Sequence, residues 1–458
     1  MNRMKNLKVK LPIGMPPPTK LTENTKLVPD RLASVAHQFF LAYIHAKRKA
    51  KRKDGIYMEP WDWFTVNSKV LKGIGSVNYR QYVAVLVTNK VIEPRLNSEG
   101  SESYLPGQRS KQYRFIPPCD LVGRFTFREY IIKDVRTISS VLSTRDAYTE
   151  QACQLIKSAS MVGVSTAVIN YLLDSLQNLE LDRFYANEII KTLPVEEQDL
   201  QEYLIDELST AIVMDAFGHR IHTWVTNLKK ELRPALKFKR SKGLCLIDIK
   251  NSQPYFASIA VDPKIAKVLL EHEYVVIKET LEKTANPLEK EFTEDCRSGR
   301  IYDLFAEQLG LCRKTTKILF FAGVMYRNRI VVDTAAKELS VAFKAKYPMT
   351  YQLFTKLRSL NKKELESIKT SLIDRTMKSH QNFRSHKLLP LLMQRAESKM
   401  VFNHIIPAFI KRGIGPVVTI HDSFVLPVEF KELAIQVIKQ AFIDIGTEPP
   451  MLSVEYLS

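Results

Sequence analysis

Two aspartates that each end an apolar run constrain this chain more than any other feature. Residues 244–247 are apolar and lead into Asp248, and residues 417–420 lead into His421 and Asp422, after which a second apolar run begins. The length and composition of these runs predict buried strands, with a hairpin turn at His421 and Asp422. If the Asp248 strand lies beside this hairpin, the two carboxylates come within a few ångströms of each other.

A close pair of carboxylates needs positive charge, because like charges repel and an unpaired buried charge is costly. Two Mg²⁺ ions, with Mn²⁺ as an alternative, would neutralise the pair. Two metals about 3.5–4 Å apart can clamp the attacking and leaving oxygens of an in-line displacement. Taken alone, each aspartate is more often a turn or cap residue, so the metal prediction for Asp248 and Asp422 depends on the motif that lies between them.

That motif is a basic helix. Arg313 and Lys317 are four residues apart and share one helix face, with Phe321 one turn further along. Two cations and an aromatic ring on one face can hold a triphosphate and stack on a base. The alternative is a solvated basic face. The apolar run at residues 318–321 favours a partly buried helix instead.

Composition indicates the partner. The 458 residues allow two or three domains, 45% of them are hydrophobic, and the net charge is +19 with an isoelectric point near 9.5. A basic surplus of this size favours a polyanion partner, either nucleic acid or an anionic membrane surface, and we take nucleic acid. The alternative is a basic but otherwise ordinary enzyme. No apolar run approaches the ~20 residues of a membrane span, and no secretory signal is visible. The five cysteines form no CxxC pair. We therefore expect reduced thiols, no zinc site and a cytoplasmic monomer without a membrane partner.

The first part of the chain predicts a nucleic-acid-binding module. Residues 1–28 are expected to be a flexible arm, and residues 28–50 a helix that runs into a basic cluster. The cluster comprises Lys47, Arg48, Lys49, Lys51, Arg52 and Lys53. Within residues 63–115 we expect a short helix, a second helix at 78–89 and a hairpin of strands 91–94 and 110–115. This order resembles the winged-helix modules of phage and plasmid replication proteins, with Lys111 and Arg114 on the wing. A small packing domain without a ligand is the alternative.

The order and spacing of the three catalytic stretches resemble those of the family A polymerase superfamily. That superfamily comprises the bacterial repair-type DNA polymerases and the single-subunit phage and mitochondrial RNA polymerases. Further stretches that agree are Gly218-His219-Arg220, Asn227-Leu228, Leu232-Arg233-Pro234, Ile301-Tyr302-Asp303 and Met393-Gln394-Arg395-Ala396-Glu397. The resemblance covers residues 216–458.

The resemblance implies an α+β right-hand polymerase with an antiparallel palm sheet, helical fingers and thumb, and an N-terminal winged helix-turn-helix-like domain. The expected domains are 1–28 (arm), 29–117 (winged helix), 118–217 (helical thumb) and 218–458 (palm and fingers). The partners would be a DNA template and primer, with dNTPs or NTPs as substrates.

Site roles follow from the same resemblance. Its catalytic residues would be Asp248, Asp422, Lys317, Arg313 and His421, with the backbone carbonyl of Ile249 as a third metal ligand. Its nucleotide-binding residues would be Arg313, Lys317, Phe321, Tyr326, Gln253 and Tyr255. Its nucleic-acid-binding residues would be Arg220, Asn227, Arg233, Gln394, Lys47, Arg48, Lys49, Arg52, Lys111 and Arg114.

The chain departs from the family pattern at three places. Ser252-Gln253 stand two residues further from Asp248 than in the DNA enzymes, and Ser423 replaces a Glu; both features lean toward the RNA enzymes. Tyr326 lies one residue late in the fingers helix, and a helical bulge would restore its place. We find no acidic clustering of the kind that marks a proofreading exonuclease.

Three functions therefore compete. The first is a DNA polymerase serving a phage or plasmid in a bacterial host, with Tyr255 as a gate against the 2′-hydroxyl, unless Tyr255 is a core residue. The second is an RNA polymerase or primase on the same scaffold. The third is a replication initiator whose polymerase-like half is inactive.

Overall fold

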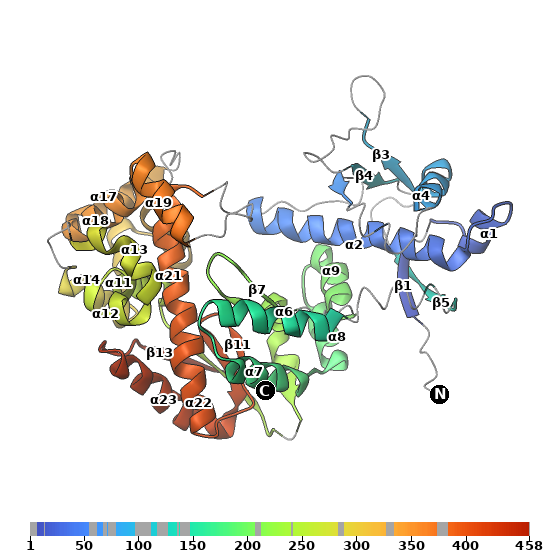
Figure 1. The fold of residues 1–458 in the computed structure, drawn as a ribbon. Helices are drawn as coiled ribbons and strands as arrows, with labels where there is room; N and C mark the ends of the chain where they lie inside the picture. Colours follow the sequence, from blue (N-terminus) through green and yellow to red (C-terminus); the bar gives the residue numbers. More distant parts are fainter. Residues whose placement is uncertain are drawn as a thin grey trace. The chain divides into compact units, whose positions relative to one another are not determined.

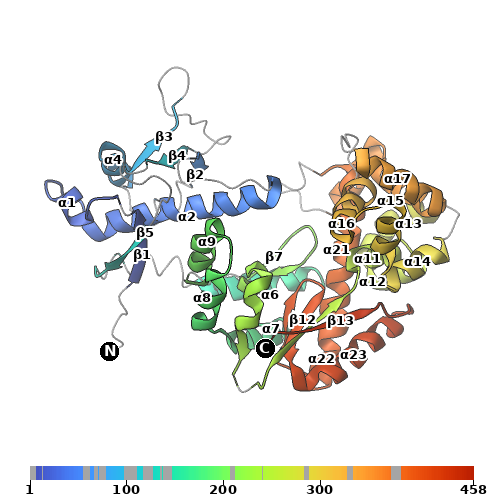
Figure 2. The same ribbon diagram turned by 180° about the vertical axis from the view of Figure 1, so that it is seen from behind.

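The computed structural model describes the chain with several gaps. The described residues are 7–12, 14–54, 62–66, 71, 79–96, 111–116, 127–134, 137, 147–206, 212–239, 241–282, 288–326, 334–372 and 383–457. The chain divides into two compact units (Figures 1 and 2). Unit 1 comprises Met1–Thr149 and Leu193–Asp206, and unit 2 comprises Glu150–Thr192 and Glu207–Ser458. This division differs from the boundaries expected after residues 28 and 117.

Unit 1 is built around one long helix. Its helices are α1 (Pro18–Thr22), α2 (Pro29–Asp54), α4 (Tyr79–Thr88) and α9 (Val195–Asp206). Its strands are β1 (Leu7–Pro12), β2 (Phe64–Thr65), β3 (Ile92–Pro94), β4 (Gln112–Phe115) and β5 (Phe127–Ile132). Helix α2 buries an apolar face that includes Leu32, Phe39 and Tyr43, and Phe64 and Phe115 from the sheet pack into the same core.

The expected flexible arm is wrong for most of its length. Strand β1 pairs antiparallel with β5, from Leu7 opposite Ile132 to Pro12 opposite Phe127. Val9 and Leu11 are buried in the core of unit 1. Apolar side chains that alternate along a strand explain this, since one face of β1 can leave water while the other stays polar.

The hairpin predicted within residues 91–115 is present. Strands β3 and β4 pair with Ile92 opposite Phe115, and β2 adds a third strand in the order β2-β4-β3. Helix α4 precedes the hairpin, close to the bounds predicted for it. The short helix expected before it falls almost wholly outside the described residues.

Unit 2 is mostly helical. Its helices are α6 (Ala147–Met161, which begins in the last residues of unit 1), α7 (Thr166–Gln177), α8 (Arg183–Lys191), α10 (Trp224–Asn227), α11 (Ser252–Ala260), α12 (Pro263–Leu269), α13 (Glu271–Glu282), α14 (Lys290–Arg297), α15 (Ile301–Leu309), α16 (Arg313–Phe320), α17 (Thr334–Lys346), α18 (Pro348–Arg358), α19 (Lys362–Leu372), α21 (Leu388–Lys399), α22 (Ile406–Lys411) and α23 (Lys431–Asp444). Short 3₁₀ turns are η2 (Lys230–Ala235), η4 (Ser385–Lys387) and η6 (Val428–Phe430), and π-helical segments are η3 (Phe321–Met325) and η5 (Met400–Ile405).

The strands of unit 2 form small antiparallel sheets. They are β6 (Leu179–Leu181), β7 (Val213–Met214), β8 (Ile221–His222), β9 (Leu236–Phe238), β10 (Leu244–Ile249), β11 (Val418–Ile420), β12 (Ser423–Pro427) and β13 (Leu452–Tyr456). Four of them form one sheet in the order β11-β12-β10-β13. Helix α23 contacts β10. Strands β10, β11 and β12 lie where the sequence predicts them.

The helices between β10 and β11 form a second cluster with an aromatic core. Phe292, Phe320 and Phe343 are fully buried, with Phe305 and Tyr347 beside them. Phe320 and Phe343 meet edge to face with ring centroids 5.6 Å apart, an arrangement that aromatic quadrupoles favour. Helix α21 continues through η5 into α22 as one rod that links this cluster to the sheet (Figure 1).

The segment at residues 118–217 is not a single helical region. It contains β5 in unit 1, β6 and β7 in unit 2, and helices that belong to both units. At the level of class the fold is α+β, mostly helical with small antiparallel sheets, as predicted.

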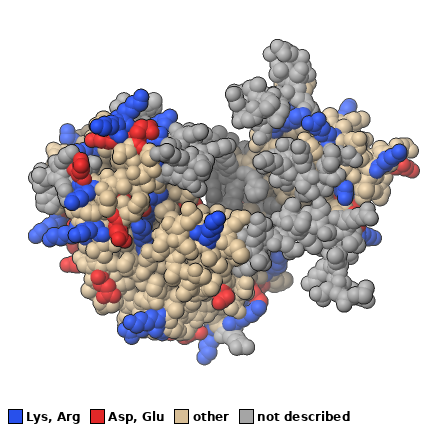
Figure 3. All heavy atoms as spheres, viewed as in Figure 1, with Lys and Arg blue, Asp and Glu red and all other residues tan. Residues whose placement is uncertain are grey.

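Other sequence-level features can be located on this fold. Cys153, Cys245, Cys296 and Cys312 are free thiols, and Cys119 lies outside the described residues. Each helix in the described part of the chain is too short or too polar to cross a membrane. On the face drawn in Figure 3, the described basic side chains are scattered among acidic and uncharged ones.

Candidate active site

The two aspartates meet at the end of the four-stranded sheet. Asp248 in β10 stands opposite Ser423 in β12, and the Ser423 hydroxyl donates a hydrogen bond to Asp248 Oδ1. Ile420 pairs with Ser423 across the hairpin, so His421 and Asp422 form a two-residue turn. His421 has a φ of 58°, the left-handed conformation that such a turn requires. The predicted neighbouring strands are therefore present.

Electrostatics show that the two carboxylates face each other. Burial, followed by the charge of Asp422, raises the pKa of Asp248 to about 6. Burial also raises the pKa of Asp422, against hydrogen bonds that include one from Ser252. The charge of Lys317 lowers both pKa values, so this ammonium faces the pair. The site concentrates negative charge that desolvation makes unfavourable.

This donor set fits a hard cation. Carboxylate and carbonyl oxygens are the ligands of Mg²⁺, which typically takes one or two protein carboxylates and completes its shell with water and substrate phosphates. In the described part of the chain, no three His, Cys, Asp or Glu side chains gather as a fuller metal cage. Asp248, Asp422 and the backbone of Ile249, which follows Asp248 in β10, match the sparse pattern of a magnesium site that phosphates complete.

His421 is a neutral imidazole. Burial, followed by the charge of Arg220, lowers its pKa to about 4. Its ring lies against that of His222 with centroids 5.3 Å apart, and its Nδ1 is buried without a hydrogen-bond partner among the described residues. Such a ring carries no charge at neutral pH, so it adds no cation to the carboxylate pair.

The Gly218-His219-Arg220 stretch is a loop that docks on α21. Arg220 donates two hydrogen bonds to Glu397, Nε to Oε1 at 2.8 Å and Nη2 to Oε2 at 2.7 Å. Ser398 donates to the carbonyl of Gly218 at 2.7 Å. A Cβ on Gly218 would come within 2.5 Å of the Gln394 amide oxygen, which explains the glycine. The predicted nucleic-acid contact Arg220 is thus held by a carboxylate of the protein itself.

Further buried charges that sequence reasoning did not select support this loop. Asp215 accepts hydrogen bonds from the backbone amides of Phe217, Gly218 and Arg220. Arg395 bonds the Phe217 carbonyl at 3.1 Å and Glu273 at 3.0 Å. The signal in the sequence was the concentration of charged residues in the otherwise apolar residues 388–402, since buried charges occur in pairs.

The basic helix is α16, as predicted, but its two cations differ in role. Arg313 donates to Asp303 at 2.6 Å and to the Asn251 side chain at 3.0 Å. Its guanidinium also lies 5.5 Å from the centre of the Tyr302 ring. Arg313 therefore ties α16 to α15 and to the start of α11. Lys317 is exposed, and its charge acts on both carboxylates.

A helical bulge follows α16, as the late position of Tyr326 requires. Segment η3 is π-helical, and the Tyr326 amide bonds the Phe321 carbonyl five residues back at 2.7 Å. The Tyr326 hydroxyl then lies 3.2 Å from Gln253 Oε1, and its ring lies 5.5 Å from that of the half-buried Phe321. One extra residue in the turn thus brings Tyr326 to the predicted nucleotide residue Gln253. π-Bulges of this kind often mark functional sites.

Tyr255 does not lie at the site. Its side chain is fully buried, and its hydroxyl donates to the Glu448 carbonyl at 2.7 Å. Its ring packs on Phe256 and Phe442, with centroids 5.8 Å and 5.5 Å away. The prediction that Tyr255 is a gate against the 2′-hydroxyl is therefore wrong, and its alternative, a core residue, is correct. Helix α11 turns this position toward α23 rather than toward the carboxylates.

The other predicted nucleic-acid contacts have varied surroundings. Arg233 in η2 interacts electrostatically with Asp248 and Asp422. Its Nε has no hydrogen-bond partner in the described part of the chain. The Asn227 side chain donates to the Thr223 carbonyl at 3.2 Å, and the amide of Gln394 lies against Gly218.

In unit 1, Arg114 pairs with Glu93 and stacks 4.7 Å from the Trp63 ring centre, and Lys47 lies 5.9 Å from that of Tyr43. Lys111 is half-buried. Arg48, Lys49 and Arg52 belong to α2, but their side chains lie outside what the structure describes.

Comparisons with known proteins find no match by sequence and a distant similarity among solved structures. No protein-family model and no curated protein sequence matches this chain. Among solved structures, the chain is distantly similar to the POL domain of Pol1 from M. smegmatis in complex with DNA primer-template and dNTP, with a TM-score of 0.31 and 11% identity. The match covers 69% of this chain and 65% of the mycobacterial chain, just under two thirds of its length.

Proposed function

We propose that unit 2 performs template-directed nucleotidyl transfer, as a compact polymerase of the family A type without a proofreading exonuclease, serving a phage or plasmid. The observation that carries this proposal is the pair Asp248 and Asp422 at neighbouring strand ends, with both pKa values raised and Lys317 facing both. A half-buried acidic pair with one facing cation suits a site that receives metal ions and phosphates.

The residues divide the work as follows. Asp248, Asp422 and the Ile249 carbonyl would hold Mg²⁺, which neutralises charge on the reacting phosphate and lowers the pKa of an attacking hydroxyl. Lys317 would stabilise the charge that builds on the leaving pyrophosphate. Arg313 orients α16 through Asp303 and Asn251. Tyr326, Gln253 and Phe321 would form the surface on which the incoming nucleotide rests.

Two observations that bear on the choice between dNTPs and NTPs support a second candidate, an RNA polymerase or primase. With Tyr255 in the core, the residue proposed to exclude a 2′-hydroxyl no longer argues for dNTPs. Ser423 hydrogen-bonds Asp248, in the place where the DNA enzymes are expected to carry a Glu. A hydroxyl beside the metal aspartate adds no third negative charge. These observations support NTPs as strongly as the general resemblance supports dNTPs.

Unit 1 would supply affinity for the nucleic acid. The hairpin of β3 and β4 holds Arg95 and Arg114 close to Trp63, Lys111 directly precedes β4, and α2 ends in the basic cluster around Lys47. Cations of this kind bind phosphates without reading sequence, so their contribution should fall steeply with salt.

A primer-extension assay tests the function. The full chain is incubated with a labelled primer on a template of known sequence, with Mg²⁺ and either dNTPs or NTPs. Extension in the order that the template dictates supports the proposal, and the preferred nucleotide decides between the two candidates. Tight DNA binding without extension by either nucleotide, under Mg²⁺ or Mn²⁺, would instead identify an inactive initiator.

A further inference from the structure

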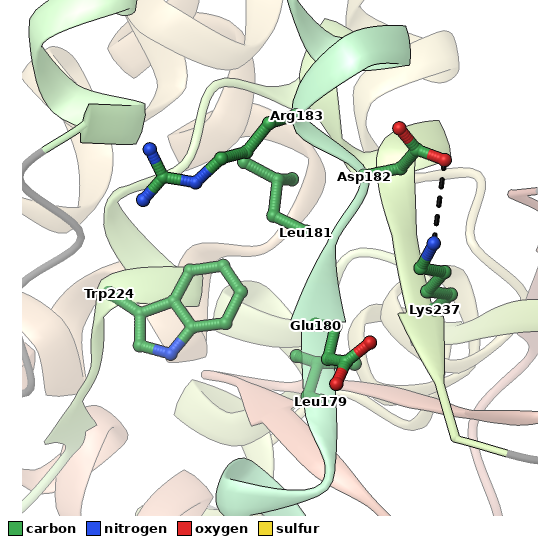
Figure 4. A pocket seen from close by; sticks show the side chains of 7 residues that line it. All are labelled: Leu179, Glu180, Leu181, Asp182, Arg183, Trp224 and Lys237. Atoms are coloured by element: carbon green, nitrogen blue, oxygen red, sulfur yellow. Dashed lines mark hydrogen bonds and ion pairs between the residues drawn. The ribbon is translucent and has the colours of Figure 1, made fainter.

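A hollow lies in unit 2 beside β6, and its lining includes none of the candidate active-site residues. Its volume is about 490 Å³, and its lining comprises β6, Asp182, Arg183, Trp224 and Lys237. Figure 4 shows the Trp224 indole and the Arg183 guanidinium on one side of the hollow, with Asp182 and Lys237 on the other. The hollow therefore offers an aromatic face, the two leucines of β6, the cations of Arg183 and Lys237, and the carboxylates of Glu180 and Asp182.

The walls of this hollow are fixed by secondary structure. Strand β6 pairs with β9, which places Lys237 opposite Glu180. Asp182 caps α8 by accepting a hydrogen bond from the Tyr185 amide at 3.1 Å, and it also pairs with Lys237 at 3.5 Å. Trp224 opens α10, where Thr223 and Thr226 cap each other. The indole is thus presented by a rigid turn.

Two more aromatic residues follow the lining residue Arg183 in sequence. Phe184 and Tyr185 directly follow Arg183 in the first turn of α8, and they are 80% and 48% exposed. A large apolar ring that is left in water is unfavourable, and clustered exposed apolar groups mark interaction sites. Phe184 and Tyr185 are therefore exposed aromatic side chains next to Arg183 in sequence, and the half-buried Trp224 lies in the lining itself.

The hollow also has a physical link to the candidate active site. Trp224 is two residues from His222, whose ring contacts His421 in the catalytic turn, and α10 packs against β11 of the same hairpin. A strand that passes over Trp224 would therefore lie near the site where nucleotides are added.

We infer that this surface, comprising Trp224, Arg183, Phe184, Tyr185 and Lys237, binds an unpaired strand of nucleic acid. Bases of a single strand can stack on aromatic side chains irrespective of sequence, while cations hold the phosphates. A duplex keeps its bases inside and cannot use the rings. The net charge of +19 favours a polyanion over a neutral or basic protein segment. The choice of nucleic acid rests on the proposed function, whose template has an unpaired part.

Tryptophan fluorescence tests this inference in the full chain. The three tryptophans are Trp61, Trp63 and Trp224, so Trp61→Phe and Trp63→Phe leave Trp224 as the reporter. Titration with short oligo(dT) or oligo(rU) should quench Trp224 saturably, and a blunt duplex of equal length should not. Phe184→Ala in this background should weaken the oligonucleotide affinity by about fivefold to a hundredfold, the range for loss of one stacked base.

Two controls separate stacking from folding. Phe184→Tyr keeps a ring and should bind within about twofold of the parent. Val275→Ala removes an exposed apolar side chain from α13, which does not line the hollow, and should also leave affinity unchanged. Absent quenching, equal quenching by duplex, or an unchanged affinity in Phe184→Ala would overturn the inference. Quenching in a protein that extends no primer would refute the polymerase proposal but not this site.

Discussion

Replacement of Tyr255 tests whether this residue belongs to the core or to the nucleotide site. Tyr255→Phe removes a hydroxyl that donates to the Glu448 carbonyl at 2.7 Å, which should destabilise the fold by about 1 kcal/mol. Tyr255→Ala also removes a fully buried ring from its contacts with Phe256 and Phe442. The cavity should cost about 3–5 kcal/mol, a large part of the stability of an ordinary domain.

Urea unfolding and single-nucleotide incorporation together measure this prediction. Tyr456→Phe serves as a control, because Tyr456 is 61% exposed and its change should stay within about 0.5 kcal/mol. The ratio of kcat/KM for NTPs to that for dNTPs should be the same in both Tyr255 variants as in the parent, assayed where each is folded. A change of about tenfold in that ratio with little loss of stability would refute the core assignment and restore the sugar gate.

Three further predictions concern the site and its supports. Lys317→Ala should raise the KM for nucleotide and lower kcat, whereas Lys314→Ala, an exposed neighbour on α16, should change neither; equal effects would assign the helix to structure only. Gly323→Ala should cost about 1–3 kcal/mol in urea unfolding, because its Cβ would lie 2.3 Å from the Ala336 carbonyl oxygen; an unchanged midpoint would show that η3 and α17 can separate freely. Glu397→Gln leaves the buried Arg220 without its charge partner and should cost about 3–5 kcal/mol; a neutral result would mean that the pair is not needed to hold the loop.

The strand ends were predictable from sequence because an apolar run followed by one Asp leaves few alternatives. The bulge at η3 was predictable for a similar reason, since the spacing from Lys317 to Tyr326 exceeds the family pattern by one residue. The burial of Tyr255 was not predictable, because the direction of a side chain depends on how α11 rotates against α23. Likewise, nothing local in the sequence indicates that Arg220 would be held by Glu397, 177 residues further along the chain.

At the N-terminus, the sequence predicted too little structure. Polar and Pro-rich composition predicted an arm, yet β1 gains its stability from β5, more than a hundred residues away. Long-range pairing of this kind overrides local propensity.

The dependence of stability on pH and Mg²⁺ tests the carboxylate pair without any assay of activity. In EDTA, the ionised form of Asp248 is disfavoured in the folded state, since its pKa is raised from its ordinary value to about 6. The contribution of the Asp248 carboxyl to stability should therefore fall by up to about 3 kcal/mol as pH rises from about 4 to about 6, and Asp248→Asn should lack this contribution while the one from Asp422 remains. Above pH 6, Mg²⁺ should restore stability to the parent but not to Asp248→Asn. If Mg²⁺ left the stability of the parent protein unchanged, the metal assignment would be contradicted.

Nucleotide addition by Asp248→Asn and Asp422→Asn tests the central claim most directly. Both variants and the parent are compared in primer extension with Mg²⁺, and their affinity for the same primer–template is measured in parallel. The account predicts that each substitution lowers extension by at least about a thousandfold, several kcal/mol of barrier, while DNA affinity stays within a few-fold. Full extension by either variant would contradict the account.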